Sequence, residues 1–316
     1  MPLLTLQCGT RFSSRHARRG ARFKRRSRNA ERPVVECRTG RAEYKRRSRN
    51  CGGYVVGLEQ DELLELALHG AREAGDLLLE RFAGPAQGVS SKSTHTDLVS
   101  DADRSSEALL MELITSKRPQ DGIYAEEGGK GASESGLRWV VDPLDGTINY
   151  LFRIPIWSVS IAVEDRDGGV VGVVHDPNRN ETFTASRGGG AWVNGAPIKV
   201  RERTDPSKAL IGTGFSYESK VRAVQAQVLT RVLPHVRDVR RPGSAALDLA
   251  YVACGRLDGF YEHTMEVYDK AAGVLLIQEA GGVVSDLPAP FGLTPGVIAA
   301  ATALHEQLSK LVLDKE

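Results

Sequence analysis

Beyond residue 57, the hydrophobic segments of this chain follow two different orders, which meet near residue 200. The first half opens with helical apolar spacing over residues 58–82, and a second helix is expected from about Asp103 to Ser116. Short apolar runs separated by Gly, Asp or Asn turns then predict five strands, at 138–141, 158–163, 170–174, 181–185 and 191–193. We therefore expect helices packed on an antiparallel sheet over residues 55–200.

After the turn at Asn194-Gly195 the pattern changes to an alternation of strands and helices. Strands are predicted at 209–212, 236–240, 257–261 and 283–284, and helices at 221–232, 245–254 and 269–280. Such alternation is typical of an α/β arrangement. The expected fold class is α+β, with an α+β half at 55–200 and an α/β half at 201–316.

Residues 1–54 differ from this body in composition. The first 53 residues contain 16 Lys and Arg against three acidic residues, a net charge of +13, whereas the rest of the chain carries −11. The sequence KRRSRN occurs twice, at 24–29 and 45–50. A basic segment without apolar periodicity is expected to be disordered in isolation. Three interpretations stay open: an organellar transit peptide, a nucleic-acid-binding segment, or an upstream region translated from a misplaced start.

Membrane and redox signals are weak. No run approaches the ~20 apolar residues of a membrane span, so no membrane partner is expected. Three of the four cysteines lie in residues 1–53, and Cys254 in the body has no C-x-x-C partner. A reducing, cytoplasmic location is expected, or an organellar one if residues 1–53 are a transit peptide.

The stretch VVDPLDGTIN, residues 140–149, contains the most informative turn. An apolar run predicts a buried strand that ends at Asp142, and Pro143 suits a type I turn, which brings Asp142 and Asp145 within about 7 Å at their Cα atoms. These carboxylates and the Leu144 carbonyl are oxygen ligands of the kind that hard divalent cations prefer. Gly146 and Thr147 precede a helix start, where N–H groups favour an anion such as phosphate. An ordinary turn explains the tetrapeptide equally well, so further acidic residues must decide.

Four other acidic residues have simple structural explanations when each is taken alone. Glu126 and Glu127 lie in YAEEGG, where a solvated loop is sufficient. Asp269 begins an apolar helix, where its side chain suits an N-cap. Asp103 lies at another helix start, where acidic residues are favoured by the helix dipole.

In combination, these motifs resemble the signature set of the inositol monophosphatase family. The set comprises E-E-G at 126–128, D-P-L-D-G-T-x-N at 142–149 and an aromatic-D-x-A-A-G segment at 268–273, in that order. G-A-W-V-N-G at 190–195 and G-S-A-A at 243–246 agree with it. The resemblance extends from Leu58 to the C-terminus and implies the layered αβαβα sugar-phosphatase fold.

The resemblance also implies a Mg²⁺-dependent phosphomonoesterase. Carried over by motif, the metal ligands are Glu126, Asp142, the Leu144 carbonyl, Asp145 and Asp269. Thr147 and Asp103 would orient a metal-bound water, with Glu126 near the same ion. The residues implied to contact substrate are Gly146, Thr147, Ser244 and Glu262. The family is usually dimeric, so a homodimer is expected.

Departures from the family pattern concern substrate choice. Tyr268 stands where the family usually has Trp, Lys270 follows the late aspartate, and Glu266 precedes it by three positions. Lys270 is expected to be solvated, or else to touch the substrate phosphate. The expected substrate is a small phosphorylated polyol, most simply myo-inositol 1-phosphate. The alternatives are histidinol phosphate, fructose 1,6-bisphosphate and, in another class, an RNA- or ribosome-associated regulatory role in which the basic extension contacts nucleic acid.

Overall fold

The computed structural model describes residues 54–84, 88–91, 98–128 and 131–313. The chain separates into two units, 1–49 and 50–316, and every element below belongs to the second. The expectations for residues 1–53 therefore lie outside the described residues. Within the described part, no helix combines the length and the apolar character that a membrane span needs.

A seven-stranded sheet occupies the first half, with strand order β3-β4-β5-β6-β7-β8-β9. Strands β4 to β9 pair antiparallel, as expected, but β3 pairs parallel with β4. A separate short antiparallel pair joins β1 and β2. The strand bounds are β1 Ser90–Ser91, β2 Leu98–Val99, β3 Gly122–Ala125, β4 Arg138–Asp145, β5 Ser158–Asp165, β6 Gly168–Asp176, β7 Glu181–Ser186, β8 Gly190–Val193 and β9 Ala196–Pro197.

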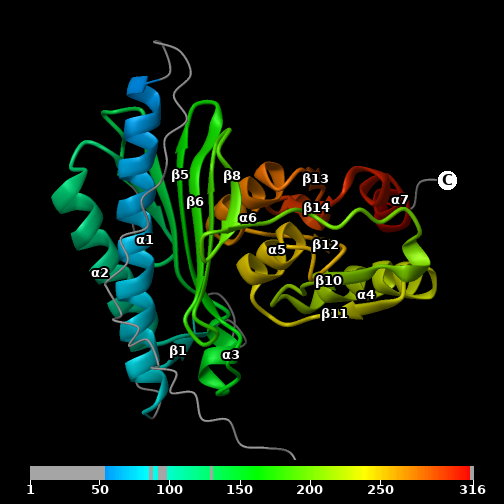
Figure 1. Ribbon diagram of the computed structural model, residues 1–316. Helices are drawn as coiled ribbons and strands as arrows, with labels where there is room; N and C mark the ends of the chain where they lie inside the picture. Colours follow the sequence, from blue (N-terminus) through cyan, green and yellow to red (C-terminus); the bar gives the residue numbers. More distant parts are fainter. Residues whose placement is uncertain (1–53, 85–87, 92–97, 129–130, 314–316) are drawn as a thin grey trace, which may run out of the picture. The chain divides into compact units, whose positions relative to one another are not determined.

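Both faces of this sheet are buried because helices cover each of them (Figure 1). Side chains alternate between the two faces of a strand, so Trp139 and Val141 of β4 pack under α1 (Tyr54–Phe82) and α2 (Asp101–Lys117). Val140 faces the opposite way, toward the core that contains α5 (Ala245–Ala253) and α6 (Val267–Glu279). This is why β4 is buried along nearly its whole length.

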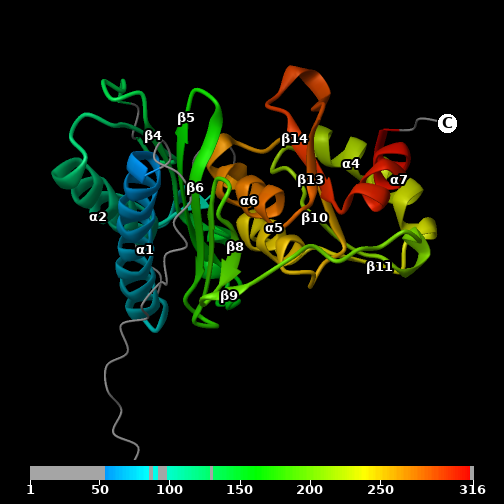
Figure 2. The ribbon, with the colours of Figure 1, turned by 45° about the horizontal axis from the view of Figure 1, so that its top comes forward.

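A five-stranded sheet of order β11-β10-β12-β14-β13 forms the second half. β10 pairs parallel with β11 and β12, whereas β14 is antiparallel to both β12 and β13. Figure 2 shows α5 and α6 on one side of it and α4 and α7 on the other. The bounds are β10 Leu210–Thr213, α4 Ser219–Val232, β11 Asp238–Arg240, β12 Gly259–Glu262, β13 Val283–Leu287, β14 Gly296–Ala300 and α7 Thr302–Leu313.

The layers follow as α1/α2, sheet, α5/α6, sheet, α4/α7, which confirms the expected α+β class and αβαβα layering. One short helix, α3 (Thr147–Leu151), and three 3₁₀ turns complete the described elements. The turns lie at Pro206–Lys208, Leu233–His235 and Pro290–Gly292. β14 and α7 were not predicted, and β13 runs past its predicted end.

α2 and α6 each begin two residues earlier than predicted, which leaves Asp103 in the first turn of its helix, as expected, but corrects the cap expected at Asp269. Ser100 caps α2 and Glu266 caps α6, so each aspartate occupies the third helical position of a capping box. In both boxes the aspartate accepts a hydrogen bond from the N–H of the capping residue. Asp269 is therefore not an N-cap.

Candidate active site

The DPLD stretch folds as a bulged strand, not as a turn that ends the strand at Asp142. β4 pairs Asp142 with Ser160 and Asp145 with Ser158, so three steps along β4 match two along β5. In a regular strand, residues three apart point to opposite faces, and one extra residue brings them to the same face. Pro143, which lacks an N–H, is tolerated within the bulge. The bulge thus lets Asp142 and Asp145 line one cavity.

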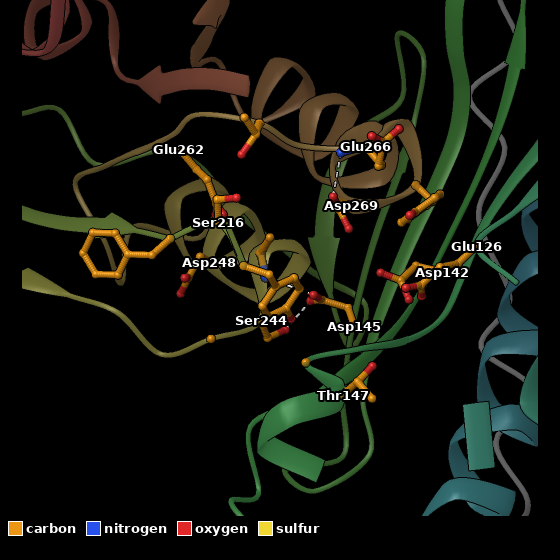
Figure 3. Close-up of a pocket in the computed structure, with 18 of the residues that line it drawn as sticks. Glu126, Asp142, Asp145, Thr147, Ser216, Ser244, Asp248, Glu262, Glu266 and Asp269 are labelled. Atoms are coloured by element: carbon orange, nitrogen blue, oxygen red, sulfur yellow. Dashed lines mark hydrogen bonds between the residues drawn. The ribbon is translucent and has the colours of Figure 1, made fainter. Parts of the chain in front are cut away.

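Glu126 reaches the same cavity through the parallel pairing of β3 with β4. Ala125 lies opposite Val141 in the register, so the next residue along β3, Glu126, lies beside Asp142. Figure 3 shows these two carboxylates side by side. A parallel arrangement was not predicted, yet it decides which of the two adjacent glutamates enters the site: Glu126 lines the cavity.

Electrostatic repulsion is the main feature of this end of the cavity. Asp142 is 2% exposed, and burial together with the charges of Glu126, Asp145 and Asp269 raises its pKa well above the usual range. Burial and the Glu126 charge raise the pKa of Asp269 in the same way. Carboxylates held together in this manner favour a bound cation.

Asp145 joins the two halves of the body. Its carboxylate accepts hydrogen bonds from the Ser244 hydroxyl and from the N–H groups of Ala245 (3.1 Å) and Ala246 (2.9 Å) at the start of α5. Ser158 donates a further bond at 3.3 Å. Burial raises the pKa of Asp145, but these donors oppose the rise because they stabilise the charged form. Ser244 lines the cavity, and its hydroxyl also holds the carboxylate of Asp145, a predicted metal ligand.

Thr147 and Asp103 form the expected pair, but only Thr147 lines the cavity. The Thr147 hydroxyl donates to the Asp103 carboxylate at 2.9 Å and lies 3.1 Å from the Leu144 carbonyl. Asp103 is fully buried, and its other oxygen accepts from the Ser100 N–H and hydroxyl. Asp103 thus lies behind Thr147 and acts through it.

Gly146 occupies a position that only glycine adopts without strain. Its φ is +94°, and a Cβ there would lie 3.0 Å from the Ile156 carbonyl oxygen. Gly146 caps α3, which begins at Thr147.

The cavity also contains Glu262 of β12, as expected, together with two residues that the sequence motifs did not indicate. These are Asp248 of α5 and Arg241, which follows β11. The sequence held a signal for Asp248, because it is the one charged residue in the apolar segment AALDLAYVA. The cavity has a volume of about 340 Å³.

A model of the inositol monophosphatase family matches residues 59–315. The chain belongs to the inositol monophosphatase family. It is 41% identical over 226 residues to Nus factor SuhB of Escherichia coli K12, a match that covers 71% of this chain and 85% of that protein. The crystal structure of SuhB from Bartonella henselae is similar with a TM-score of 0.75 at 35% identity, covering 81% of this chain and 100% of that one. The inositol monophosphatase of Anabaena gives a TM-score of 0.70 at 35% identity, covering 81% and 97%. Family and fold together support a phosphatase.

Two departures from the family pattern now have a structural description. Tyr268 lines the cavity and stacks on Tyr124, with ring centroids 6.0 Å apart. Lys270 is half-buried, and its ammonium donates to the Pro295 carbonyl at 2.6 Å. Neither expectation for Lys270, a solvated side chain or a phosphate contact, describes this arrangement, because the side chain bonds to a neighbouring loop.

The donor set fits a magnesium site in its chemistry. Glu126, Asp142, Asp145 and Asp269 contribute carboxylates and Leu144 a carbonyl, all of them hard oxygen donors facing one space. The residues present thus match the metal type that the family implies. Among the described residues, however, no group of three or more His, Cys, Asp or Glu side chains is already arranged to hold a metal ion, so the carboxylates would have to move closer together when an ion binds.

Proposed function

We propose that this protein is a Mg²⁺-dependent phosphomonoesterase that hydrolyses a small polyol phosphate, with myo-inositol 1-phosphate as the first candidate. One observation carries the proposal: acidic groups from β3, β4 and α6 converge at one end of a cavity whose other end carries polar side chains from β12 and α5. Such a division suits a phosphate at the first end and a hydroxylated group at the second.

In this proposal Glu126, Asp142, Asp145, Asp269 and the Leu144 carbonyl hold Mg²⁺. When bound, Mg²⁺ polarises phosphoryl oxygens and offsets charge that develops in phosphoryl transfer. The Asp145 carboxylate is already oriented by α5 and Ser244, and the Asp269 carboxylate by the Glu266 N–H at 2.7 Å. These hydrogen bonds hold two of the four carboxylates in place before an ion binds.

The chain itself positions the attacking water through Thr147. Asp103 accepts a hydrogen bond from the Thr147 hydroxyl, which leaves the lone pairs of that oxygen able to accept a hydrogen bond from water. The N–H groups of Gly146 and Thr147 would hold phosphate oxygens at the start of α3. Thr147 takes part in both arrangements, so one turn of backbone would place the water next to the phosphate.

The test is phosphate release by the full-length chain from three substrates: myo-inositol 1-phosphate, histidinol phosphate and fructose 1,6-bisphosphate. Each is assayed with Mg²⁺, with EDTA, and with the Asp142→Asn variant. We expect Mg²⁺-dependent release that is fastest with inositol 1-phosphate and is lost in the variant. Release that continues in EDTA, or none from any substrate by folded protein, contradicts the proposal. A homodimer and a cytoplasmic location stay predictions.

A second candidate function is binding of RNA in a regulatory complex. It is favoured by the 41% identity to a protein named Nus factor SuhB and by the basic composition of residues 1–53. It predicts RNA affinity that falls steeply with salt, is lost on deleting residues 1–53, and persists in Asp142→Asn. Affinity that is absent at low salt contradicts it.

A further inference from the structure

Asp248 is a buried acid that packing does not explain. It lies in α5 among seven buried residues, is only 2% exposed, and one of its carboxyl oxygens has no hydrogen-bond partner in the described structure. A buried acceptor without a partner destabilises a fold and calls for an explanation. An apolar residue would suit α5 better if stability alone mattered.

The surroundings of Asp248 point to a ligand. Asp248 lines the cavity with Glu262 and Arg241, and Figure 3 shows Asp248 and Glu262 on the side away from Glu126 and Asp142. Burial raises the pKa of Glu262 to about 8, while Arg241 opposes the rise. Burial and then the Glu262 charge raise the pKa of Asp248. The side chains of Asp248, Glu262 and Arg241 therefore interact electrostatically within one part of the cavity.

Gly214 leaves room for the Glu262 carboxylate because it has no side chain. A Cβ on Gly214 would lie 1.9 Å from a carboxylate oxygen of Glu262, far inside van der Waals contact. Any larger residue at 214 would displace the carboxylate from its place. The loop after β10 thus preserves an open polar wall opposite the predicted metal ligands.

Hydrogen-bonding chemistry identifies what this wall suits. A hydroxyl group both donates and accepts, whereas a guanidinium only donates and an ionised carboxylate only accepts. Arg241 with Asp248 and Glu262 supplies both kinds of partner. Among the described residues that line the cavity, Arg241 is the only Lys or Arg, so a second phosphate would find a single cationic partner there.

We propose that Asp248 and Arg241 bind hydroxyl groups of the leaving alcohol and so determine a preference for polyol monophosphates over phosphomonoesters without hydroxyls. This inference rests on the proposed phosphatase function and deepens it. The substrate class is a compact polyol with several free hydroxyls and a single phosphate. Asp248 lies on the side of the cavity away from Glu126 and Asp142 (Figure 3), so the chemical step is left to the other end.

The experiment compares two substrates in the full-length enzyme with Mg²⁺: myo-inositol 1-phosphate, and phenyl phosphate, which has no hydroxyl on its leaving group. kcat/KM is measured for wild type, Asp248→Asn and Arg241→Gln. We expect each substitution to lower the inositol 1-phosphate to phenyl phosphate ratio by about tenfold or more, mainly through KM for inositol 1-phosphate, because a hydrogen bond to a charged partner is lost. Activity on phenyl phosphate should fall less than activity on inositol 1-phosphate.

Asp258→Asn is the matched control. Asp258 is also a 2% exposed aspartate, but it pairs with Arg203 and accepts from the Leu210 N–H, and it does not line the cavity. Its substitution should lower stability and leave the substrate ratio unchanged. The ratio does not depend on how much of a preparation is folded, which separates specificity from stability.

An unchanged ratio in both cavity variants overturns the inference, and so does an equal loss on both substrates. If Asp248→Asn does not fold, Arg241→Gln decides by the same ratio. Wild-type enzyme without Mg²⁺-dependent release from either substrate refutes the proposed function instead, so the two failures are distinct.

Discussion

Asp142→Asn should make the metal-free protein more stable while removing its response to magnesium. The substitution keeps an oxygen that can accept the Leu144 N–H bond, which is 3.1 Å long. It removes a buried charge whose neighbours are Glu126, Asp145 and Asp269. Relief of an uncompensated buried charge contributes on the order of 1–3 kcal/mol, and 1 kcal/mol corresponds to roughly 2–4 °C in Tm for a body of this size.

The pH dependence of that gain has a definite sign. Folding raises the pKa of Asp142 above the value of about 3.9 expected in the unfolded chain. The folded wild-type protein therefore binds this proton more tightly, and it loses stability as pH rises from about 4 through the raised pKa. The Tm advantage of the variant in EDTA should be largest at pH 7–8 and should shrink toward pH 4.

Magnesium should reverse the order of stability. Wild type gains about 2.7 kcal/mol when Mg²⁺ is present at 100 times its Kd, whereas the variant lacks one proposed ligand. Calorimetry of both proteins in EDTA and in Mg²⁺ measures the reversal. Asp176→Asn is the control: Asp176 is fully buried but pairs with Arg179 at 2.8 Å, so its loss should destabilise. If Asp142→Asn is less stable than wild type in EDTA at pH 7.5, the repulsion argument is wrong.

Two further predictions concern the walls of the site. Thr147→Val keeps the shape of the side chain but removes the hydroxyl that bonds to Asp103. The value of kcat should therefore fall by about 100-fold or more, while the Mg²⁺-induced rise in Tm persists. A kcat within about threefold of wild type would rule out the proposed role. Lys270→Met removes the bond to the Pro295 carbonyl, so amide hydrogen exchange over residues 290–296 should accelerate. Because Leu293 and Thr294 of that loop line the cavity, KM should rise about two- to tenfold. Unchanged exchange would show that Lys270 does not hold the loop.

The sequence alone determined the local features of this protein. Apolar spacing placed the helix at 58–82 because its signal recurs every turn over many residues. Strands β4 to β8 of the first sheet were found because turn residues separate them, whereas β3 and β9 were not predicted. The DPLDGT motif also predicted that Asp142 and Asp145 lie close together, because residues three apart in the sequence cannot be far apart in space. Beyond residue 284 the signals are short and Ala-rich, and β14 and α7 were not found.

Tertiary structure decided everything that depends on pairing between distant segments. The bulge that turns Asp145 to the face of Asp142 exists because β5 sets the register of β4, and the parallel β3–β4 pair selects Glu126 over Glu127. Asp103 lies behind Thr147, the residue that follows it by 44 positions in the sequence. Asp248 shares a cavity with the metal end because α5 packs between two sheets. Local sequence carries no record of such contacts, because they arise from chain folding over long separations and are fixed by the packing of the whole body.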